Sequence, residues 1–351
     1  MTTESTRAPE RPGPKNLRRR AVAMTDGPAV TVTPPAGDRL PATVTPDIPG
    51  VDLAAWLAVS GDILKGLLHT HGAVLFRGFG ISGPEGLERL VLAVSPEAMN
   101  YVYGSTPRTR EMRQVYTSTE YPASESIPLH NELAYATTWP MRLWFLSHKA
   151  AETGGATPLA DSRKVYERIP EDVRNRFAEH GVMYVRNYGS GMDLTWQQAF
   201  ETEDPAEVER FCEESGIEYT WFPDQRLRTK QIAQAVVQHP VTGEWSWFNQ
   251  AHLFHTSSLP QEARETLLET LEPIELPRNA LYGDGTPIED EVIKAIHEAM
   301  EAEYRAEGWS DGDVMLIDNV LVAHGRQPYT GARKVLVAMS EPASSDFGGT
   351  R

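Results

Sequence analysis

The chain has 351 residues, 40% hydrophobic and 23% charged, so we expect a globular protein with a sizeable core. Its 33 basic and 49 acidic side chains give a formal charge of −16, which argues against nucleic-acid binding because phosphate contacts need a basic face. The single cysteine excludes intrachain disulfides and cysteine-rich metal sites, and no apolar run is long enough for a membrane span, so we expect a cytoplasmic protein.

The two ends of the chain differ in composition from its middle. Residues 1–36 are rich in Pro, Thr, Ala and Arg and lack apolar periodicity, so we expect a disordered leader, within which Met24 is an alternative start. Residues 344–351 are typical of a flexible tail. Because the middle contains no repeat and no long linker, we predict a single domain over residues 37–343.

Apolar spacing predicts helices and strands along this domain. In chain order the predicted helices are 51–69, 84–94, 163–180 with a start or kink at Pro170, 205–215, 260–270 and 289–306. The predicted strands are 72–77, 141–148, 245–249, 314–318 and 334–339. The strands do not alternate regularly with crossover helices, which favours a mainly β core with inserted helices, an α+β arrangement, over a doubly wound sheet.

One glycine motif suggests a nucleotide site but lacks the required context. Residues 78–83 fit the pattern G-x-G-x-x-G between a predicted strand and a predicted helix. However, no second strand ending in Asp or Glu follows about 20 residues later, as a dinucleotide site requires. We therefore interpret this segment as a strand-to-helix turn.

A histidine and a carboxylate at close spacing form the best candidate for a metal site. His130 and Glu132 are two residues apart, so in an extended segment they would point to the same face. An imidazole and a carboxylate are two of the three protein ligands of a facial triad. The complete triad leaves three of the six positions on Fe(II) for other ligands. His324, which follows an apolar strand and a predicted turn at Asp318-Asn319, is the best candidate for the third ligand.

The other histidines offer weaker candidates. His252 and His255 could share one face of a helix, but no acidic residue stands near them in the sequence, so we expect them in a polar core or a site wall. The remaining histidines in or beside predicted helices are expected to be structural, namely His69, His71, His180 and His297.

Two further segments carry residues that suit a 2-oxo acid. Arg333 is a candidate anchor for the far carboxylate because its planar fork can bind both oxygens, a geometry that the adjacent Lys334 lacks. Arg326 is a weaker rival that could instead brace the strand end. Thr157, in the segment GGAT, could add a hydrogen bond from its hydroxyl to the same carboxylate.

These pieces occur in the order typical of one enzyme family. The motifs are VLFRG (74–78), LHNE (129–132), GGAT (154–157), HPVTGEWSWFN (239–249), GDVMLIDNVLVAHGR (312–326) and RKVLVAM (333–339). Over residues 50–341 the chain resembles the TauD/TfdA family of Fe(II)/2-oxoglutarate-dependent dioxygenases, and within it most closely the SyrP-like subgroup. The resemblance implies a double-stranded β-helix, or jelly-roll, core flanked by helices.

The resemblance also assigns roles to residues of the predicted site. It implies that His130, Glu132 and His324 bind Fe(II), that Arg333 and Thr157 bind 2-oxoglutarate, and that O₂ is the oxidant. Most of the family has Asp where this chain has Glu132, but the SyrP-like subgroup also has Glu. Halogenating relatives have a small residue there, so the carboxylate implies hydroxylation, or desaturation or cyclisation, rather than halogenation.

The substrate is less well defined by the sequence. The resemblance implies an amino acid or an amino-acid derivative, free or tethered to a peptidyl carrier protein, in specialised metabolism such as antibiotic biosynthesis. The candidate substrate contacts are Tyr116, Ser118, Arg142, Arg228 and Asn249, and the candidate supporting residues are Asn319 and Arg326. For Asn249 a role in capping a hairpin, and for the two arginines an ordinary ion pair, are alternative interpretations.

Two other classes of function fit part of the pattern. One is a jelly-roll protein that binds a ligand without catalysis. The other is a zinc hydrolase, because two His and one Glu also form catalytic zinc sites. Stoichiometric 2-oxoglutarate binding would separate the dioxygenase from both. The oligomeric state stays open.

Overall fold

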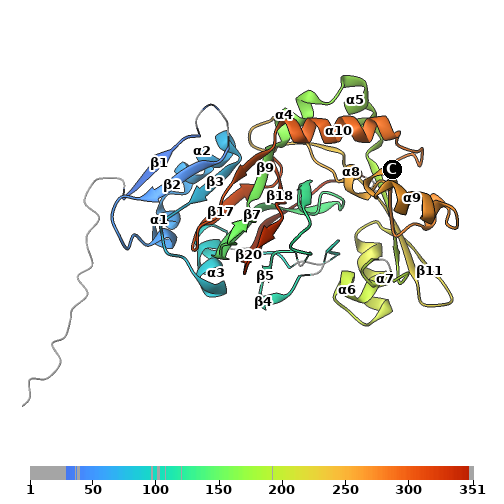
Figure 1. Ribbon diagram of the computed structural model, residues 1–351, viewed down its shortest axis with the longest axis horizontal. Helices are drawn as coiled ribbons and strands as arrows, with labels where there is room; N and C mark the ends of the chain where they lie inside the picture. Colours follow the sequence, from blue (N-terminus) through green and yellow to red (C-terminus); the bar gives the residue numbers. More distant parts are fainter. Residues whose placement is uncertain are drawn as a thin grey trace, which may run out of the picture.

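The computed structural model describes residues 29–347, except 36, 38–39, 96–97, 101–102, 107, 120 and 192. Its largest element is an eight-stranded sheet with the order β1-β2-β3-β17-β7-β20-β5-β4 (Figure 1). The strands are β1 (Val30–Thr33), β2 (Ala42–Pro46), β3 (Ala73–Phe76), β17 (Val314–Asp318), β7 (Thr138–Lys149), β20 (Lys334–Ser344), β5 (Val115–Thr117) and β4 (Arg110–Met112). All neighbouring strands are antiparallel except β2 and β3.

A smaller sheet packs on one face of the large sheet. Its order is β16-β9-β18-β6, with β16 (Arg305–Glu307), β9 (Thr157–Asp161), β18 (Val322–Arg326) and β6 (Ile127–His130). Side chains alternate between the two faces of a strand, so in β7 Leu143 and Phe145 point to the small sheet, where Phe145 packs against His324. Two facing sheets of this kind are the arrangement expected of a jelly-roll core.

Three helices cover the other face of the large sheet. They are α1 (Leu53–Val59), α2 (Gly61–His71) and α3 (Gly83–Val94), and they pack on the alternate β7 residues Trp144 and Leu146. The single helix predicted for 51–69 is thus two helices that meet at Ser60. Gly72 ends α2 in the left-handed region, φ 69°, where an added Cβ would lie 2.4 Å from Cγ2 of Val322.

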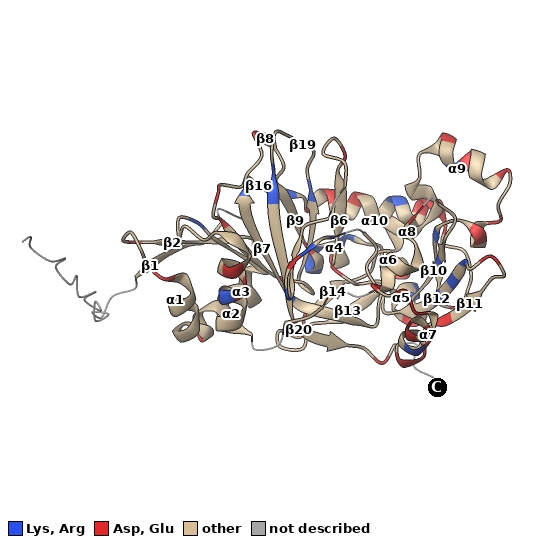
Figure 2. Cartoon of the chain, turned by 90° about the horizontal axis from the view of Figure 1, so that it is seen from below, with Lys and Arg blue, Asp and Glu red and all other residues tan. Residues whose placement is uncertain are grey.

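A third sheet and most of the remaining helices form the end of the molecule opposite α1 and β1 (Figures 1 and 2), whereas α4 lies beside β9 and β18. The sheet has the order β11-β12-β10-β15, with β11 (Glu218–Trp221), β12 (Leu227–Ala233), β10 (Val182–Tyr188) and β15 (Arg278–Tyr282). The helices are α4 (Ser162–Arg168), α5 (Glu171–His180), α6 (Trp196–Phe200), α7 (Pro205–Glu214), α8 (Ala251–Phe254), α9 (Gln261–Leu268) and α10 (Asp290–Ala302). The short strands β13 (Val236–Gln238) and β14 (Trp245–Trp247), and β8 (Thr153–Gly154) and β19 (Tyr329–Thr330), form two hydrogen-bonded pairs. Single turns of 3₁₀ helix occupy Thr256–Ser258 and Pro273–Glu275.

The predicted boundaries need correction at both ends. Residues 30–33 of the predicted leader form β1, paired with β2, whereas residues 1–28 lie outside the described part. At the other end β20 includes Ser344, and the N–H of Ser345 donates to the carbonyl of Thr137 (3.0 Å), so the predicted tail begins within the sheet. Residues 348–351 lie outside the described part.

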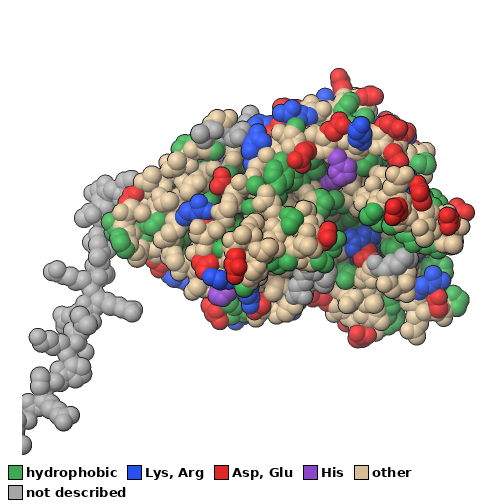
Figure 3. All heavy atoms as spheres, viewed as in Figure 1, with side chains coloured by type: hydrophobic (Ala, Val, Ile, Leu, Met, Phe, Trp, Pro, Cys, Tyr) green, Lys and Arg blue, Asp and Glu red, His purple; other side chains and the backbone are tan. Residues whose placement is uncertain are grey.

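The predicted internal elements are largely present. The helix predicted for 289–306 ends at Ala302, and residues 305–307 form β16 at the edge of the small sheet. Pro170 separates α4 from α5, as predicted. Among the described residues, no helix combines the length and apolar character needed to cross a membrane. Acidic side chains lie across the face shown in Figure 3, in keeping with the net charge of −16.

Candidate metal and co-substrate site

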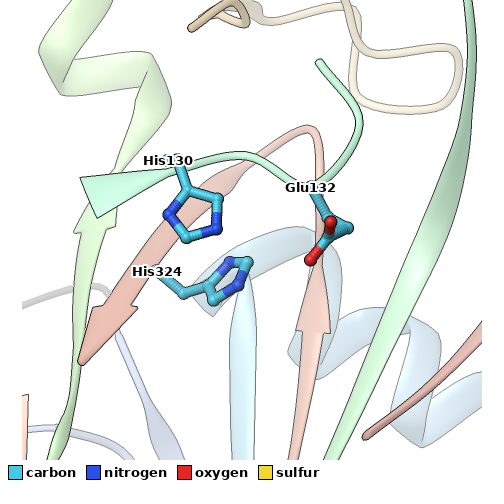
Figure 4. A group of neighbouring side chains, drawn as sticks. All are labelled: His130, Glu132 and His324. Atoms are coloured by element: carbon cyan, nitrogen blue, oxygen red, sulfur yellow. The ribbon is translucent and has the colours of Figure 1, made fainter. Parts of the chain in front are cut away.

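Three side chains converge beside the paired strands β6 and β18 (Figure 4). His130, Glu132 and His324 each offer a ligand atom, and these atoms all lie within 4.8 Å of one another. The two histidines are direct partners across β6 and β18, and their ring centroids are 4.4 Å apart. The fold therefore brings the predicted metal ligands together from two segments that are far apart in the sequence.

Glu132 reaches this position from a turn. β6 ends at His130, so the extended segment that would place both side chains on one face does not include Glu132. Asn319, in the turn between β17 and β18, accepts the Glu132 N–H on Oδ1 (2.8 Å) and donates Nδ2 to the Glu132 carbonyl (2.9 Å). These two hydrogen bonds, rather than strand pairing, position the backbone that carries the carboxylate. They give Asn319 the supporting role expected from the sequence.

Both imidazoles are held in the form that binds metals. Nδ1 of His130 lies 2.8 Å from the carbonyl of Pro128, and a carbonyl only accepts, so Nδ1 carries the proton and Nε2 is left as a ligand. Burial lowers the pKa of His130, although Glu132 opposes the shift. Burial, aided by His130 and Arg108, holds the pKa of His324 well below its usual range.

The donor set fits Fe(II). Nδ1 of His324 is buried and has no hydrogen-bond partner within the described part of the chain. Two neutral imidazoles and one carboxylate are the ligand set of a facial triad, which suits Fe(II) with open positions. The residues present therefore match the metal that the motifs imply.

A cavity joins the two histidine ligands to the predicted co-substrate residues. His130, His324, Thr157 and Arg333 all line it. The guanidinium of Arg333 lies 5.3 Å from the centre of the Tyr329 ring, and its Nε donates to the carbonyl of Gly155 (3.1 Å). Burial, aided by Arg326, lowers the pKa of Arg333 to about 10, so the group stays charged at neutral pH and a bound carboxylate would offset its desolvation.

Thr157 lines the cavity, and Gly155 lies against Arg333, which also lines it. Nε1 of Trp309 donates to Oγ1 of Thr157 (3.0 Å), which leaves the hydroxyl proton of Thr157 for an acceptor in the cavity. A Cβ at Gly155 would lie 3.1 Å from Cδ of Arg333, so a side chain there would push the arginine, and the φ of +70° also favours glycine. Lys334, the rival anchor, is not among the cavity residues and instead pairs with Glu111 (2.8 Å).

Arg326 lines the cavity but is engaged with the backbone. Its guanidinium donates to the carbonyls of Tyr121 (3.0 Å), Pro122 (2.6 Å) and Glu125 (2.8 Å). It therefore braces residues 121–125 against β18, the second of the two roles that the sequence suggests.

Of the five predicted substrate contacts, only Ser118 lines the cavity. Tyr116 is buried in β5 opposite Val337, and its hydroxyl accepts a hydrogen bond from Arg110 (3.2 Å). Asn249 is buried and binds backbone, donating Nδ2 to the carbonyl of Ala235 (2.8 Å). Its Oδ1 also accepts the N–H of Ala251 (3.0 Å), so the capping interpretation fits its contacts better than substrate binding.

The two arginines of that set have partners within the fold. Arg142 forms an ion pair with the buried carboxylate of Asp318. Arg228 donates to Oδ1 of Asn187 (2.7 Å) in the third sheet. Neither is among the cavity residues, so the ion-pair interpretation fits Arg142, and a polar contact within the sheet fits Arg228.

The rival histidines also have structural partners. Nε2 of His252 lies 2.9 Å from the carbonyl of Leu129, the residue before His130, and burial lowers the pKa of His252 to about 3. Nδ1 of His255 lies 2.8 Å from the hydroxyl of Ser257. Neither belongs to the cluster of potential metal ligands.

Two residues that contact side chains of the site are absent from the sequence-based predictions. Nη2 of Arg108 donates to Oε2 of Glu132 (2.6 Å), and both side chains are only 4% exposed. Arg108 stands in a polar segment without apolar spacing or a motif, so nothing local marks it. The other is Trp309, whose position just before the GD motif could have suggested a place beside the site.

Comparison with known proteins gives the same picture. The sequence model of the family described as taurine catabolism dioxygenase TauD, TfdA family, matches residues 34–339. The dapdiamide synthesis protein DdaC of Enterobacter agglomerans is 42% identical over 276 residues, which are 79% of this chain and 84% of that protein. A clavaminate synthase-like protein of Arabidopsis thaliana is 32% identical over 288 residues, which are 79% of this chain and 83% of that protein.

Solved structures share the fold at low sequence identity. PvcB of Pseudomonas aeruginosa has a TM-score of 0.53 and 16% identity, over 91% of this chain and 93% of that chain. AAD-2, solved in complex with Mn(II) and N-oxalylglycine, has a TM-score of 0.51 and 12% identity, over 91% of this chain and 99% of that chain. The predicted jelly-roll fold is confirmed. The chain belongs to the TauD/TfdA family and is an Fe(II)- and 2-oxoglutarate-dependent dioxygenase.

Proposed function

We propose that this enzyme hydroxylates an unactivated C–H bond of an amino acid or amino-acid derivative, with Fe(II) bound by His130, Glu132 and His324. Arg333 and Thr157 bind the far carboxylate of 2-oxoglutarate. The observation that carries this assignment is the cavity lined by His130, His324, Thr157 and Arg333. It places the cluster of three metal-ligand side chains beside a half-buried arginine and a threonine hydroxyl. A hydrolytic zinc site would need no such anchor for a keto acid.

The metal and its co-substrates supply the oxidising chemistry, in which 2-oxoglutarate is converted to succinate and CO₂. The protein supplies geometry. Arg333 offers a planar fork for a carboxylate, and Thr157 donates its hydroxyl proton to the same group. Ile127, Phe145 and Val335 line the cavity with apolar surface, which keeps water from the reacting centre.

Glu132 favours hydroxylation over halogenation. Its carboxylate lies with the two histidines, so the position that a halide would need is filled by a protein ligand. Desaturation or cyclisation of the same C–H position would use the same ligand set. The identity of the product therefore depends on the substrate that fills the remaining space.

The substrate class is part of the proposal. DdaC is named for dapdiamide synthesis, and it is 42% identical to this chain. This relation supports a small amino-acid-derived substrate in specialised metabolism. Both a free substrate and one tethered to a peptidyl carrier protein are consistent with it.

The test is a succinate assay with matched substrate panels. The Fe(II)-loaded protein is incubated with 2-oxoglutarate, O₂ and amino acids, either free or loaded on a peptidyl carrier protein, and products are analysed by mass spectrometry. We expect one panel to raise succinate formation and to yield a product heavier by one oxygen atom. Folded, iron-loaded protein that forms neither succinate nor an oxidised product with either panel would contradict the proposal.

A further inference from the structure

The ion pair between Arg108 and Glu132 is the feature of the cavity that the roles above leave unexplained. Nη2 of Arg108 lies 2.6 Å from Oε2 of Glu132, and both side chains are 4% exposed. A charge-assisted hydrogen bond with this burial is strong and fixes its partners. One oxygen of the metal-binding carboxylate is therefore held by a cation, and the other oxygen, Oε1, remains for a metal.

Contacts from two sides hold the segment that carries Arg108. From the third sheet, Arg186 donates to the carbonyl of Gly104 (2.9 Å) and Arg278 to that of Ser105 (2.6 Å). These two arginines are direct partners across β10 and β15.

The second set of contacts comes from the large sheet. The N–H of Thr109 donates to Oγ1 of Thr117 (2.9 Å), and the N–H of Thr117 donates to the carbonyl of Thr109 (2.8 Å). Backbone fixed at 104–105 and at 109 fixes the origin of the Arg108 side chain. The fold thus holds the guanidinium of Arg108 at the site.

The backbone of Glu132 is fixed as well. Asn319 grips both backbone groups of Glu132, so the side chain must span from a fixed turn to Arg108 and to the metal position. A glutamate has one more methylene than an aspartate, which is a reach of about 1.5 Å. An aspartate at this position would reach either the arginine or the metal, but not both.

We propose that Arg108 is a positioning residue that keeps Glu132 bound to the metal through one oxygen, and that the length of Glu132 is matched to Arg108. The inference rests on the proposed metal site and goes beyond it, because it assigns a role to the extra methylene that Glu132 has over an aspartate. A carboxylate that uses one coordination position leaves three for 2-oxoglutarate and O₂. Without Arg108 the second oxygen is released to the metal and competes with 2-oxoglutarate.

The test is a double-mutant cycle that is read by Co(II) binding to metal-free protein, without turnover. The proteins are wild type, Arg108→Gln, Glu132→Asp and the double variant, and the readouts are the Co(II) dissociation constant and the visible Co(II) spectrum. We expect Glu132→Asp to weaken Co(II) binding by about ten-fold or more when Arg108 is present, and by clearly less in the Arg108→Gln background. We expect Arg108→Gln alone to change the Co(II) spectrum and to weaken 2-oxoglutarate binding to the Co(II) protein by about ten-fold.

Arg110→Gln is the matched control. Arg110 lies two residues away on β4, pairs with Glu201 and has a side chain that is 48% exposed, so its loss should change neither readout. Circular dichroism and thermal melting establish that each variant is folded. If Arg108→Gln does not fold, Arg108→Lys replaces it, since lysine keeps the charge but lacks the planar fork.

The outcomes separate this inference from the proposed function. Folded wild type that binds no Co(II) would overturn the metal site itself. Wild type that binds Co(II), with the same cost of Glu132→Asp in both backgrounds, would overturn the matched length while the metal site stands. An Arg108→Gln protein with the wild-type Co(II) spectrum and 2-oxoglutarate affinity would overturn the positioning role, even if its KM for the organic substrate rises.

Discussion

The two walls of the cavity are built in different ways. On the metal side, His130 and His324 are neighbours across paired strands, and Asn319, which grips Glu132, belongs to the same motif as His324. The segment that carries Arg108, by contrast, is held by Arg186 and Arg278 of the third sheet through the backbone carbonyls of residues 104 and 105. The metal side thus depends on two sequence motifs whose strands pair directly, whereas the position of Arg108 depends on the third sheet, which carries no such motif.

This difference has a consequence for substitutions. Changes on the metal side should abolish the chemistry while leaving the fold intact, because the small sheet is held by backbone hydrogen bonds. Changes to the other cavity residues, among them Arg333 and Thr157, should alter affinities by graded amounts. The following substitutions test that division.

The largest effect is expected from loss of a metal ligand. His324→Ala should reduce succinate formation by more than the roughly 10- to 100-fold that loss of an outer partner of a metal ligand costs. His148→Ala is the control, because His148 is exposed and lies outside the ligand cluster. Succinate measured by mass spectrometry checks the result, and retained turnover in His324→Ala would remove His324 from the proposed triad.

The next effect concerns the co-substrate anchor. Arg333→Leu should weaken 2-oxoglutarate binding by roughly 100-fold, because a buried charge pair between protein and ligand loses one partner. Lys334→Leu should have little effect, since Lys334 pairs with Glu111 outside the cavity. Calorimetric titration of the Co(II) protein with 2-oxoglutarate measures both, and the reverse pattern would transfer the anchor to Lys334.

Two buried asparagines allow the metal side to be tested against a structural control. Asn319→Ala removes the grip on the Glu132 backbone and should weaken Co(II) binding by roughly 10- to 100-fold. Asn249→Ala removes hydrogen bonds to Ala235 and Ala251 and should lower thermal stability without changing Co(II) affinity. Equal losses of Co(II) affinity in the two variants would show that the effect of Asn319 is general destabilisation.

A pH dependence is expected from His252, behind the metal side. Burial lowers its pKa in the folded state to about 3, whereas an unfolded histidine titrates near 6.5. Between these values the unfolded state binds a proton that the folded state does not, so stability falls as pH falls, by about 1.4 kcal/mol per pH unit.

His252→Gln should remove this contribution while keeping a donor near the carbonyl of Leu129. The loss of unfolding free energy between pH 7 and pH 5 should then be smaller than in wild type by about 2 kcal/mol. Urea unfolding at both pH values measures it. The same loss in variant and wild type would contradict a low pKa for His252.

The smallest effect is expected from Trp309. Trp309→Phe removes the donor to Thr157, which frees the hydroxyl to turn away from the co-substrate, and should weaken 2-oxoglutarate binding by roughly two- to ten-fold. Trp245→Phe is the control, because Trp245 is 45% exposed and far from this contact in the sequence. Unchanged affinity in Trp309→Phe would mean that the orientation of Thr157 does not depend on the indole.

The same division explains what the sequence could predict. Residues of the metal side lie in short motifs beside apolar strands, so the candidates His130, Glu132 and His324 could be selected without a structure. The turn at Glu132 could not be predicted, because Asn319 fixes it from a distant segment.

The third sheet could not be predicted for a different reason. Its strands β10 and β12 bury polar side chains, among them Arg186, Thr229 and Gln231, which break the apolar alternation expected of a strand. Arg108 stands in a segment with no periodic pattern, and its position depends on that sheet. Local sequence therefore indicates candidate residues where chemistry and motif coincide, and it gives no indication of positions that tertiary contacts decide.

The most direct test of the account is an anaerobic titration of metal-free protein with Fe(II) and then 2-oxoglutarate. We predict a weak visible charge-transfer band from the chelate in wild type and its absence in the Glu132→Ala/His324→Ala variant. If the folded wild-type protein gives no band, or the double variant keeps it, then His130, Glu132 and His324 are not the iron site.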